Sequence, residues 1–157
     1  MALKTRVRFP PLPPIYVIKM RLYNIYGKQQ SKNVTKYLID WNKKSRSKVQ
    51  FQTKSFLKSY WKNCIVYEEF PVFGSRMSVD LLNATKKIAI EVQGKQHSSF
   101  NKFFHNNSRS KYLDGIKRDY EKSVWLKNNN FILIEIEEDE VPNLTYDFFK
   151  DKFDILL

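Results

Sequence analysis

The chain has 157 residues, with 28 Lys or Arg against 16 Asp or Glu, and a formal net charge of +12. This length fits one domain, and a hydrophobic content of 42% with 15% aromatic residues excludes a disordered chain. Its single cysteine, Cys64, excludes an internal disulfide and a cysteine-rich zinc site, and no run of about 18 apolar residues is present to span a membrane.

The positive charge is concentrated in the first part of the chain. Residues 1–67 contain fifteen Lys or Arg and one acid, a net charge of +14, whereas residues 68–157 contain thirteen bases and fifteen acids, a net charge of −2. Lysine-rich coding in an AT-rich genome would spread the lysines evenly, so the asymmetry favours a nucleic-acid partner. No segment combines a basic face with a long apolar stripe, so we expect no membrane partner. The N-terminus has prolines where a signal peptide needs its apolar core, and no spanning run is present, so we expect an intracellular (cytoplasmic) protein.

Residues 1–48 are expected to form a basic N-terminal arm that contains a short helix. Loose alternation over residues 16–26 predicts a strand, and residues 34–41 favour a helix with Asn33 as its N-cap. The basic loop that follows contains four candidates for phosphate contacts, namely Lys43, Lys44, Arg46 and Lys48. The alternative for this loop is an ordinary solvated surface.

Residues 49–157 predict one α/β domain. The spacing over residues 51–63 indicates a helix with an apolar face and, on another face, the exposed lysines Lys54, Lys58 and Lys62. Residues 65–72 predict a strand, in which Pro71 places the end at a sheet edge or a bulge.

After a central hairpin, residues 95–113 predict a long loop and residues 114–128 a second helix. That helix is expected to turn Ile116, Tyr120, Val124 and Trp125 to the core and to expose Lys117, Arg118 and Lys122. The apolar run 131–136 predicts a buried strand, and residues 142–157 a terminal helix held by Phe148, Phe149 and Phe153. The fold class is therefore α/β, a mixed central sheet flanked by helices, with a basic N-terminal extension.

The central hairpin, residues 77–94, contains the candidate site. With its turn centred between Ala84 and Lys87, residue i faces residue 171 minus i, so Asp80 lies opposite Glu91. Two facing carboxylates repel each other, and a divalent cation such as Mg²⁺ or Mn²⁺ between them removes that cost. The alternative is a register shifted by one, in which Asp80 ends the strand in solvent and Glu91 pairs with a lysine.

Asp80, followed after ten residues by Glu91-Val-Gln93, resembles the core of the PD-(D/E)XK nuclease superfamily. The continuation Gly-Lys-Gln-His97 and the later Lys117-Arg118-Asp119 resemble its Vsr-like, EDxHD endonuclease branch, over roughly residues 50–136. The resemblance implies a restriction-endonuclease-like core over residues 49–157 and cleavage of DNA with Mg²⁺ or Mn²⁺ held by Asp80 and Glu91.

The chain departs from that pattern at two positions. Gln93 stands where the family has a lysine; its carbonyl could orient the attacking water, but it supplies no positive charge, and Lys95 is the first candidate to replace it. The first helix has no glutamate aimed at the metal. Gln50 or Gln52 occupies the approximate place, so either the metal shell is incomplete or Glu68 or Glu69 substitutes.

The resemblance also implies roles for two residues beyond the metal pair. His97 would act as general acid or base, although a histidine after a glycine is otherwise a surface or loop-packing residue. Asp119 would orient the histidine or a water, or instead pairs with Lys122 one turn along the helix. Further candidates for phosphate contacts, each of which could equally be solvated surface, are Lys95, Arg109, Lys111, Lys117 and Arg118.

Two functions follow from the sequence. The first is a metal-dependent DNA endonuclease of the nicking, homing or repair type, with a possible homodimer for double-strand cutting. The alternative is a nucleic-acid-binding accessory subunit that retains the nuclease fold without catalysis, which the two departures favour. A basic structural protein of a ribonucleoprotein would explain the charge but leave the Asp80, Glu91 and His97 spacing a coincidence.

Overall fold

The computed structural model describes residues 17–94 and 109–157, without the side chains of residues 109–111. Residues 1–16 of the predicted N-terminal arm and the residues Lys95 and His97 lie outside these ranges, as do the side chains of Arg109 and Lys111. The elements are β1 (Lys19–Tyr23), β2 (Gln29–Asn33), η1 (Thr35–Tyr37), α1 (Lys48–Trp61), β3 (Val66–Pro71), β4 (Ser78–Asn83), β5 (Ile88–Gln93), α2 (Arg109–Asn128), β6 (Ile132–Glu137), η2 (Val141–Asn143) and α3 (Tyr146–Phe153).

The main sheet has four strands in the order β3-β4-β5-β6, in which only β5 and β6 run parallel. The prediction of a mixed sheet is therefore confirmed. The hairpin register is also as predicted, because Leu81 pairs with Ile90 and Asn83 with Ile88. Asn83 closes the turn, since its Oδ1 accepts the Lys86 N–H at 2.9 Å.

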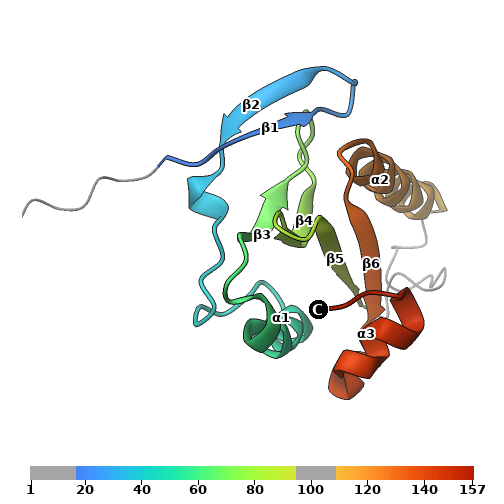
Figure 1. Ribbon diagram of the computed structural model, residues 1–157. Helices are drawn as coiled ribbons and strands as arrows, with labels where there is room; N and C mark the ends of the chain where they lie inside the picture. Colours follow the sequence, from blue (N-terminus) through green and yellow to red (C-terminus); the bar gives the residue numbers. More distant parts are fainter. Residues whose placement is uncertain (1–16, 95–108) are drawn as a thin grey trace, which may run out of the picture.

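Helices and a second, two-stranded sheet cover the two faces of the main sheet. Figure 1 shows α1 and α3 on one face, and the β1–β2 hairpin with α2 on the other. Each face has its own apolar cluster: Leu57, Trp61 and Phe149 pack on the first, and Phe70, Phe73 and Trp125 on the second. Among the described helices, none is long and apolar enough to cross a membrane.

The N-terminal region differs from the prediction of one strand followed by a helix. It forms a hairpin, and only the 3₁₀ turn η1 lies within the predicted helix 34–41. The chain reverses at Gly27, whose φ of +74° suits glycine, and Asn24 Oδ1 accepts the N–H groups of Tyr26 and Lys28. Because β2 is a polar segment without apolar alternation, its sequence carries no strand signal.

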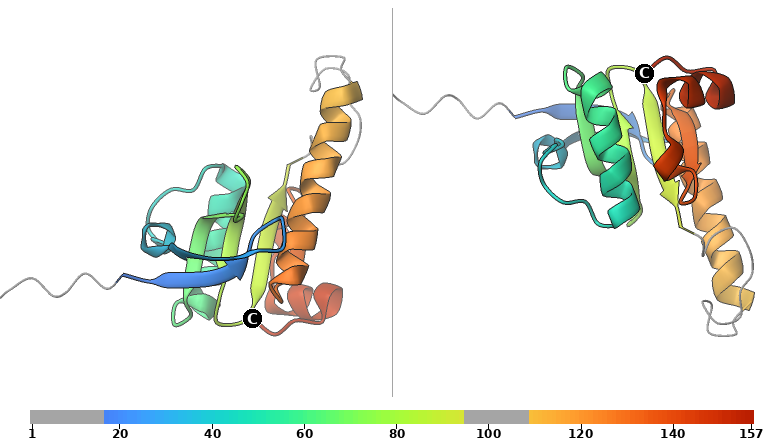
Figure 2. Two further views of the ribbon diagram at one scale, coloured as in Figure 1. Left: turned by 90° about the horizontal axis from the view of Figure 1, so that it is seen from above. Right: turned by 90° about the horizontal axis from the view of Figure 1, so that it is seen from below.

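The second helix begins at Arg109, earlier than predicted, and its core face is also different. Figure 2 shows α2 running past the ends of the sheet strands. Only its C-terminal part packs on the sheet, through Trp125 and Leu126, whereas Ile116, Tyr120 and Val124 are exposed. Strand β6 was predicted to be buried, but as an edge strand it leaves Ile132 more than half exposed.

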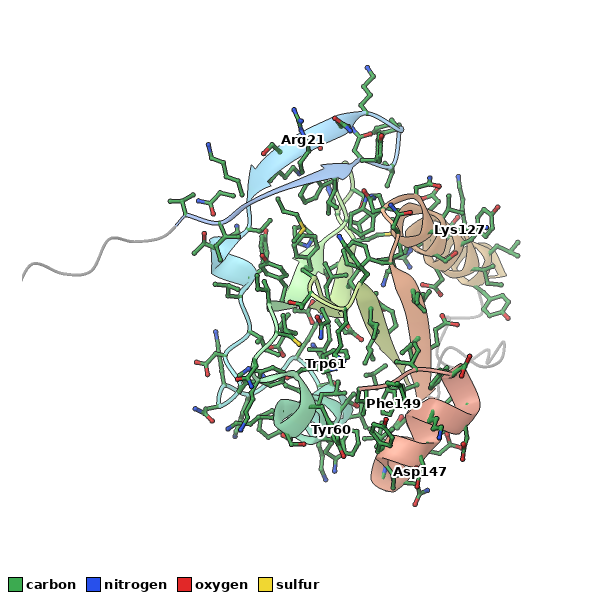
Figure 3. All side chains as sticks on the ribbon, in the orientation of Figure 1. Arg21, Tyr60, Trp61, Lys127, Asp147 and Phe149 are labelled. Carbon is green, nitrogen blue, oxygen red and sulfur yellow. The ribbon has the colours of Figure 1, made fainter. Side chains whose placement is uncertain are left out.

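The first helix starts where Ser47 Oγ caps the Gln50 N–H at 3.1 Å. Its buried face includes Lys54, which was predicted to be exposed; the side chain is fully buried, and Nζ lies 2.7 Å from Glu68 Oε2 on β3. The Glu68 carboxylate offsets part of the cost of burying this charged lysine. The apolar part of the face reaches α3 (Figure 3), where Phe149 lies against the α1 residue Phe56 at 5.8 Å between ring centroids.

The β1–β2 hairpin is fixed to the C-terminal end of α2 by Asn129. This buried side chain accepts the Tyr23 N–H at 2.7 Å through Oδ1 and donates to the Tyr23 carbonyl at 3.1 Å through Nδ2. Trp125 Nε1 donates to the same carbonyl at 2.6 Å. Together with Leu22 and Val34 in the apolar cluster, these bonds attach the hairpin to residues beyond the predicted boundary at residue 48.

Replacing Asn129 with alanine should lower the free energy of unfolding by about 2–3 kcal/mol, because it leaves the Tyr23 N–H without its acceptor. Urea denaturation monitored by circular dichroism measures the change. The adjacent exposed Asn128→Ala is the matched control and should change stability by less than about 0.5 kcal/mol. Equal losses in the two variants would contradict the assigned role of Asn129.

Candidate metal and nucleic-acid site

The Asp80 and Glu91 carboxylates lie side by side where β4 and β5 stop pairing through their backbones. The Asp80 N–H donates to Glu91 Oε1 at 3.3 Å, and the Val92 N–H donates to Asp80 Oδ2 at 2.9 Å. Each side chain thus takes a place that a backbone carbonyl would occupy in a continued ladder. The predicted juxtaposition is present, and neither the shifted register nor an Asp80 in bulk solvent is found. The other part of the alternative is present, because Glu91 does pair with a lysine, Lys122.

Burial makes this pair electrostatically costly. Desolvation, and secondly the neighbouring Asp80 charge, raise the pKa of Glu91 to about 7. The pKa of Asp80 is also raised, mainly by desolvation. Two carboxyl groups so close together share a proton near neutral pH unless positive charge is supplied.

Lys122 of α2 supplies part of that charge. Its ammonium lies 2.7 Å from Glu91 Oε2, and both side chains are largely buried. From the sequence, we expected this lysine to be exposed, or paired with Asp119 on its own helix. Lys122 precedes Trp125 and Leu126 by three and four residues, so it belongs to the face of α2 that turns inward.

A third carboxylate, Glu69 of β3, lies close to the pair. The ladder between β3 and β4 skips Glu69 and Asp80, and Glu69 has a φ of +51°, a left-handed conformation that costs a non-glycine residue about 1–3 kcal/mol. Gln50 Nε2 donates to Glu69 Oε1 at 3.2 Å, and Ser78 Oγ donates to Oε2 at 2.8 Å. Of the two acids considered as substitutes, Glu68 is bound by Lys54, so Glu69 is the one placed near Asp80.

The carboxylates of the site could supply only part of the ligand shell of a hard cation. Two adjacent carboxylates suit Mg²⁺ or Mn²⁺, which retain waters and bind one or two carboxylates. Within the described ranges, no three His, Cys, Asp or Glu side chains are grouped closely enough to hold a metal ion. The pair therefore could hold a cation whose shell is completed by water and by a phosphate oxygen.

Two hollows beside Asp80 contain basic side chains. One, of about 730 Å³, is lined by Asp80 with Arg46, Lys48 and the first turn of α1, and by a second acid, Glu138. A second, of about 410 Å³, contains Asp80 with the α2 residues Arg118, Asp119 and Lys122, and also Arg46 and Arg76. The two hollows meet at Arg46 and Asp80, so a polyanion lying over the carboxylates would contact cations on both sides.

A third hollow, next to the first two, brings together more of the predicted basic loop. It is lined by Lys43, Lys44 and Arg46, together with Glu68 and Glu69. Lys117 lies on the exposed surface of α2 and lines none of these three hollows.

Two further residues, Asp119 and Gln93, were predicted to belong to the site. Asp119 lines the second hollow with Asp80, whereas the Gln93 amide donates to Glu135 Oε1 on β6 at 3.3 Å. Lys122 and Arg76 were not predicted as functional residues, whereas Glu69 was one of the two acids expected as a substitute for the missing glutamate. The inward spacing of Lys122 could have revealed it, but the positions of Arg76 and Glu69 depend on the turn before β4 and on the irregular β3 backbone.

No protein family model and no solved structure matches the chain. The uncharacterized protein 033L of Invertebrate iridescent virus 3 is 35% identical over 66 residues, which are 42% of this chain. The chain spans about a third of the length of that relative, whose name states no activity.

The free energy of unfolding should fall as pH rises from 5 to 8 because of Glu91. A carboxyl with a pKa near 7 in the folded protein and about 4.5 when unfolded is protonated preferentially in the folded state, so its contribution is present below about pH 4.5 and lost through pH 7. Between these pH values the free energy of unfolding of Glu91→Gln should fall by on the order of 2 kcal/mol less than that of the wild type. Urea titrations at several pH values, with the exposed Glu135→Gln as control, measure it; parallel curves for wild type and Glu91→Gln would refute the assignment.

Proposed function

We propose that the chain is a metal-dependent DNA endonuclease that hydrolyses phosphodiester bonds. The observation that carries the proposal is the buried Asp80–Glu91 pair, held at the end of two strands with a lysine on one oxygen. A buried like-charge pair costs stability, and a cation site is the chemistry that gives it a use. The basic hollows on both sides favour a nucleic acid as the substrate.

The resemblance to the Vsr-like branch of the PD-(D/E)XK nucleases supports the same function. A helix before the sheet, the β4–β5 hairpin with its two acids, and the crossover through α2 to the parallel strand β6 are consistent with a restriction-endonuclease-like core. The substrate proposed is DNA, and the cofactor Mg²⁺ or Mn²⁺.

Asp80 and Glu91 would hold the cation. When bound, it would lower the pKa of a water and neutralise the charge on the phosphate. Lys122 would stabilise negative charge beside Glu91, which Gln93 cannot do. Arg46 and Arg118, which line the second hollow and with it the groove over Asp80, would orient the backbone phosphates. Asp119 and His97 would hold or transfer a proton.

A nicking assay on supercoiled plasmid tests the two carboxylates. With Mg²⁺ or Mn²⁺ the wild type should convert the plasmid to open circles, and Asp80→Ala and Glu91→Ala should each reduce the rate at least about 100-fold. Glu135→Ala is the control, because Glu135 pairs with Glu91 in the sheet yet is exposed. It should retain the wild-type rate.

The accessory-subunit alternative is decided by the same protein samples. A wild type that binds DNA tightly but does not cut plasmid, mismatched or branched substrates with either cation would establish it. Cleavage that persists in both carboxylate variants would instead point to another site or to a contaminating nuclease.

Lys122→Met should lower the single-turnover cleavage rate about 100-fold, because it removes positive charge from the reacting phosphate. It should weaken DNA binding by less than about tenfold, since the other basic residues of the groove remain. Lys127→Met is the matched control, an exposed lysine on the same helix, and should change neither quantity. Rapid-quench kinetics and fluorescence anisotropy separate the two effects; an unchanged cleavage rate would limit Lys122 to balancing the charge of Glu91.

A further inference from the structure

The side of α2 opposite the candidate site carries an exposed apolar stripe. Leu113, Ile116, Tyr120 and Val124 recur at three- and four-residue intervals and are 51%, 49%, 69% and 37% exposed. This spacing places the four side chains along one face of a helix. Isolated exposed apolar residues are normal in soluble proteins, but an ordered stripe of four marks an interaction surface.

The proposed nuclease site does not use this stripe. The residues of α2 that line the groove are Gly115, Arg118, Asp119 and Lys122, which continue the inward face of Trp125 and Leu126. The stripe follows a different face, and where α2 extends past the strands it has no sheet to cover it (Figure 2). It therefore needs an explanation of its own.

We propose that this stripe, from Leu113 to Val124, binds the same stripe on a second copy of the chain with the two α2 helices antiparallel. In that arrangement Leu113 of one copy meets Val124 of the other. Ile116 and Tyr120 meet around the two-fold axis. The stripe is then self-complementary, as a two-fold symmetric interface requires.

The charges beside the stripe match this partner. Lys117 and Glu121 lie one turn apart on the same edge of the stripe, and neither forms an ion pair with another described residue. The antiparallel pairing that joins Leu113 to Val124 also brings Lys117 of one copy to Glu121 of the other, twice over. A sequence that places opposite charges at these positions favours this register over a shifted one.

The β1–β2 turn extends the same surface. Tyr26 is 74% exposed and shares a small hollow of about 190 Å³ with Tyr120, Glu121 and Val124. Four apolar residues a side with the flanking Tyr26 make a small interface, so we expect a weak dimer with a dissociation constant of roughly 10–100 μM. The two candidate sites would lie on the outer sides of the helix pair.

Sedimentation equilibrium of the full chain, without DNA and over about 5–300 μM, tests the proposal. The wild type should dimerise, and Ile116→Glu/Tyr120→Glu should weaken association at least about tenfold. Leu156→Glu, at an apolar position that is 61% exposed elsewhere, is the matched control and should dimerise as the wild type does. Circular dichroism verifies that each variant is folded.

Exchanging the charges of Lys117 and Glu121 tests the same interface without removing apolar surface. Lys117→Glu should weaken the dimer, and Lys117→Glu/Glu121→Lys should restore it, because the swapped pair is complementary again. A wild type that stays monomeric at the highest concentration would overturn the proposal. So would a dimer unaffected by the Ile116 and Tyr120 substitutions, one equally weakened by Leu156→Glu, or a charge swap that does not restore association.

Discussion

The repulsion between Asp80 and Glu91 is the constraint that explains most of the unusual features of this molecule. The β4–β5 ladder stops there, and each carboxylate accepts a hydrogen bond from the backbone of the opposite strand. The pKa of Glu91 is raised to about 7, and the Lys122 ammonium on α2 forms an ion pair with the Glu91 carboxylate. Removal of charge by a bound cation would relieve the same repulsion, which links the stability of the fold to the proposed chemistry.

The remainder of the fold holds these groups in place. The apolar layers fix the sheet from both faces, and the Asn129 clamp fixes the C-terminal end of α2 to the N-terminal hairpin. Because α2 is held at that end, its other half extends past the strands and lines the groove with Arg118, Asp119 and Lys122. The buried Lys54–Glu68 pair keeps one acid of β3 occupied, while Gln50 and Ser78 hold Glu69 near Asp80.

The hairpin register and the elements that follow it could be predicted because strand alternation and the Asn83 turn are local signals. The β1–β2 hairpin could not, since β2 is polar and the hairpin is held by distant bonds, from Ile25 to Phe73 and from Tyr23 to Asn129. The prediction of which face of α2 is buried was wrong. Ile116 and Tyr120 have the spacing of core residues, but the sheet ends before it reaches them. Lys54 and Lys122 were expected in solvent for a related reason: their carboxylate partners, Glu68 and Glu91, lie on strands distant in sequence.

The most direct test of the account is calorimetric titration of Mn²⁺ into the protein at pH 6.5, in buffers of different ionisation enthalpy. Glu91 is largely protonated at that pH, so cation binding should release roughly 0.5–1 proton per site, and Asp80→Asn should abolish the binding. Glu135→Gln should bind as the wild type does. An absence of binding up to about 10 mM Mn²⁺, or binding that releases no proton and persists in Asp80→Asn, would contradict a cation site at this pair.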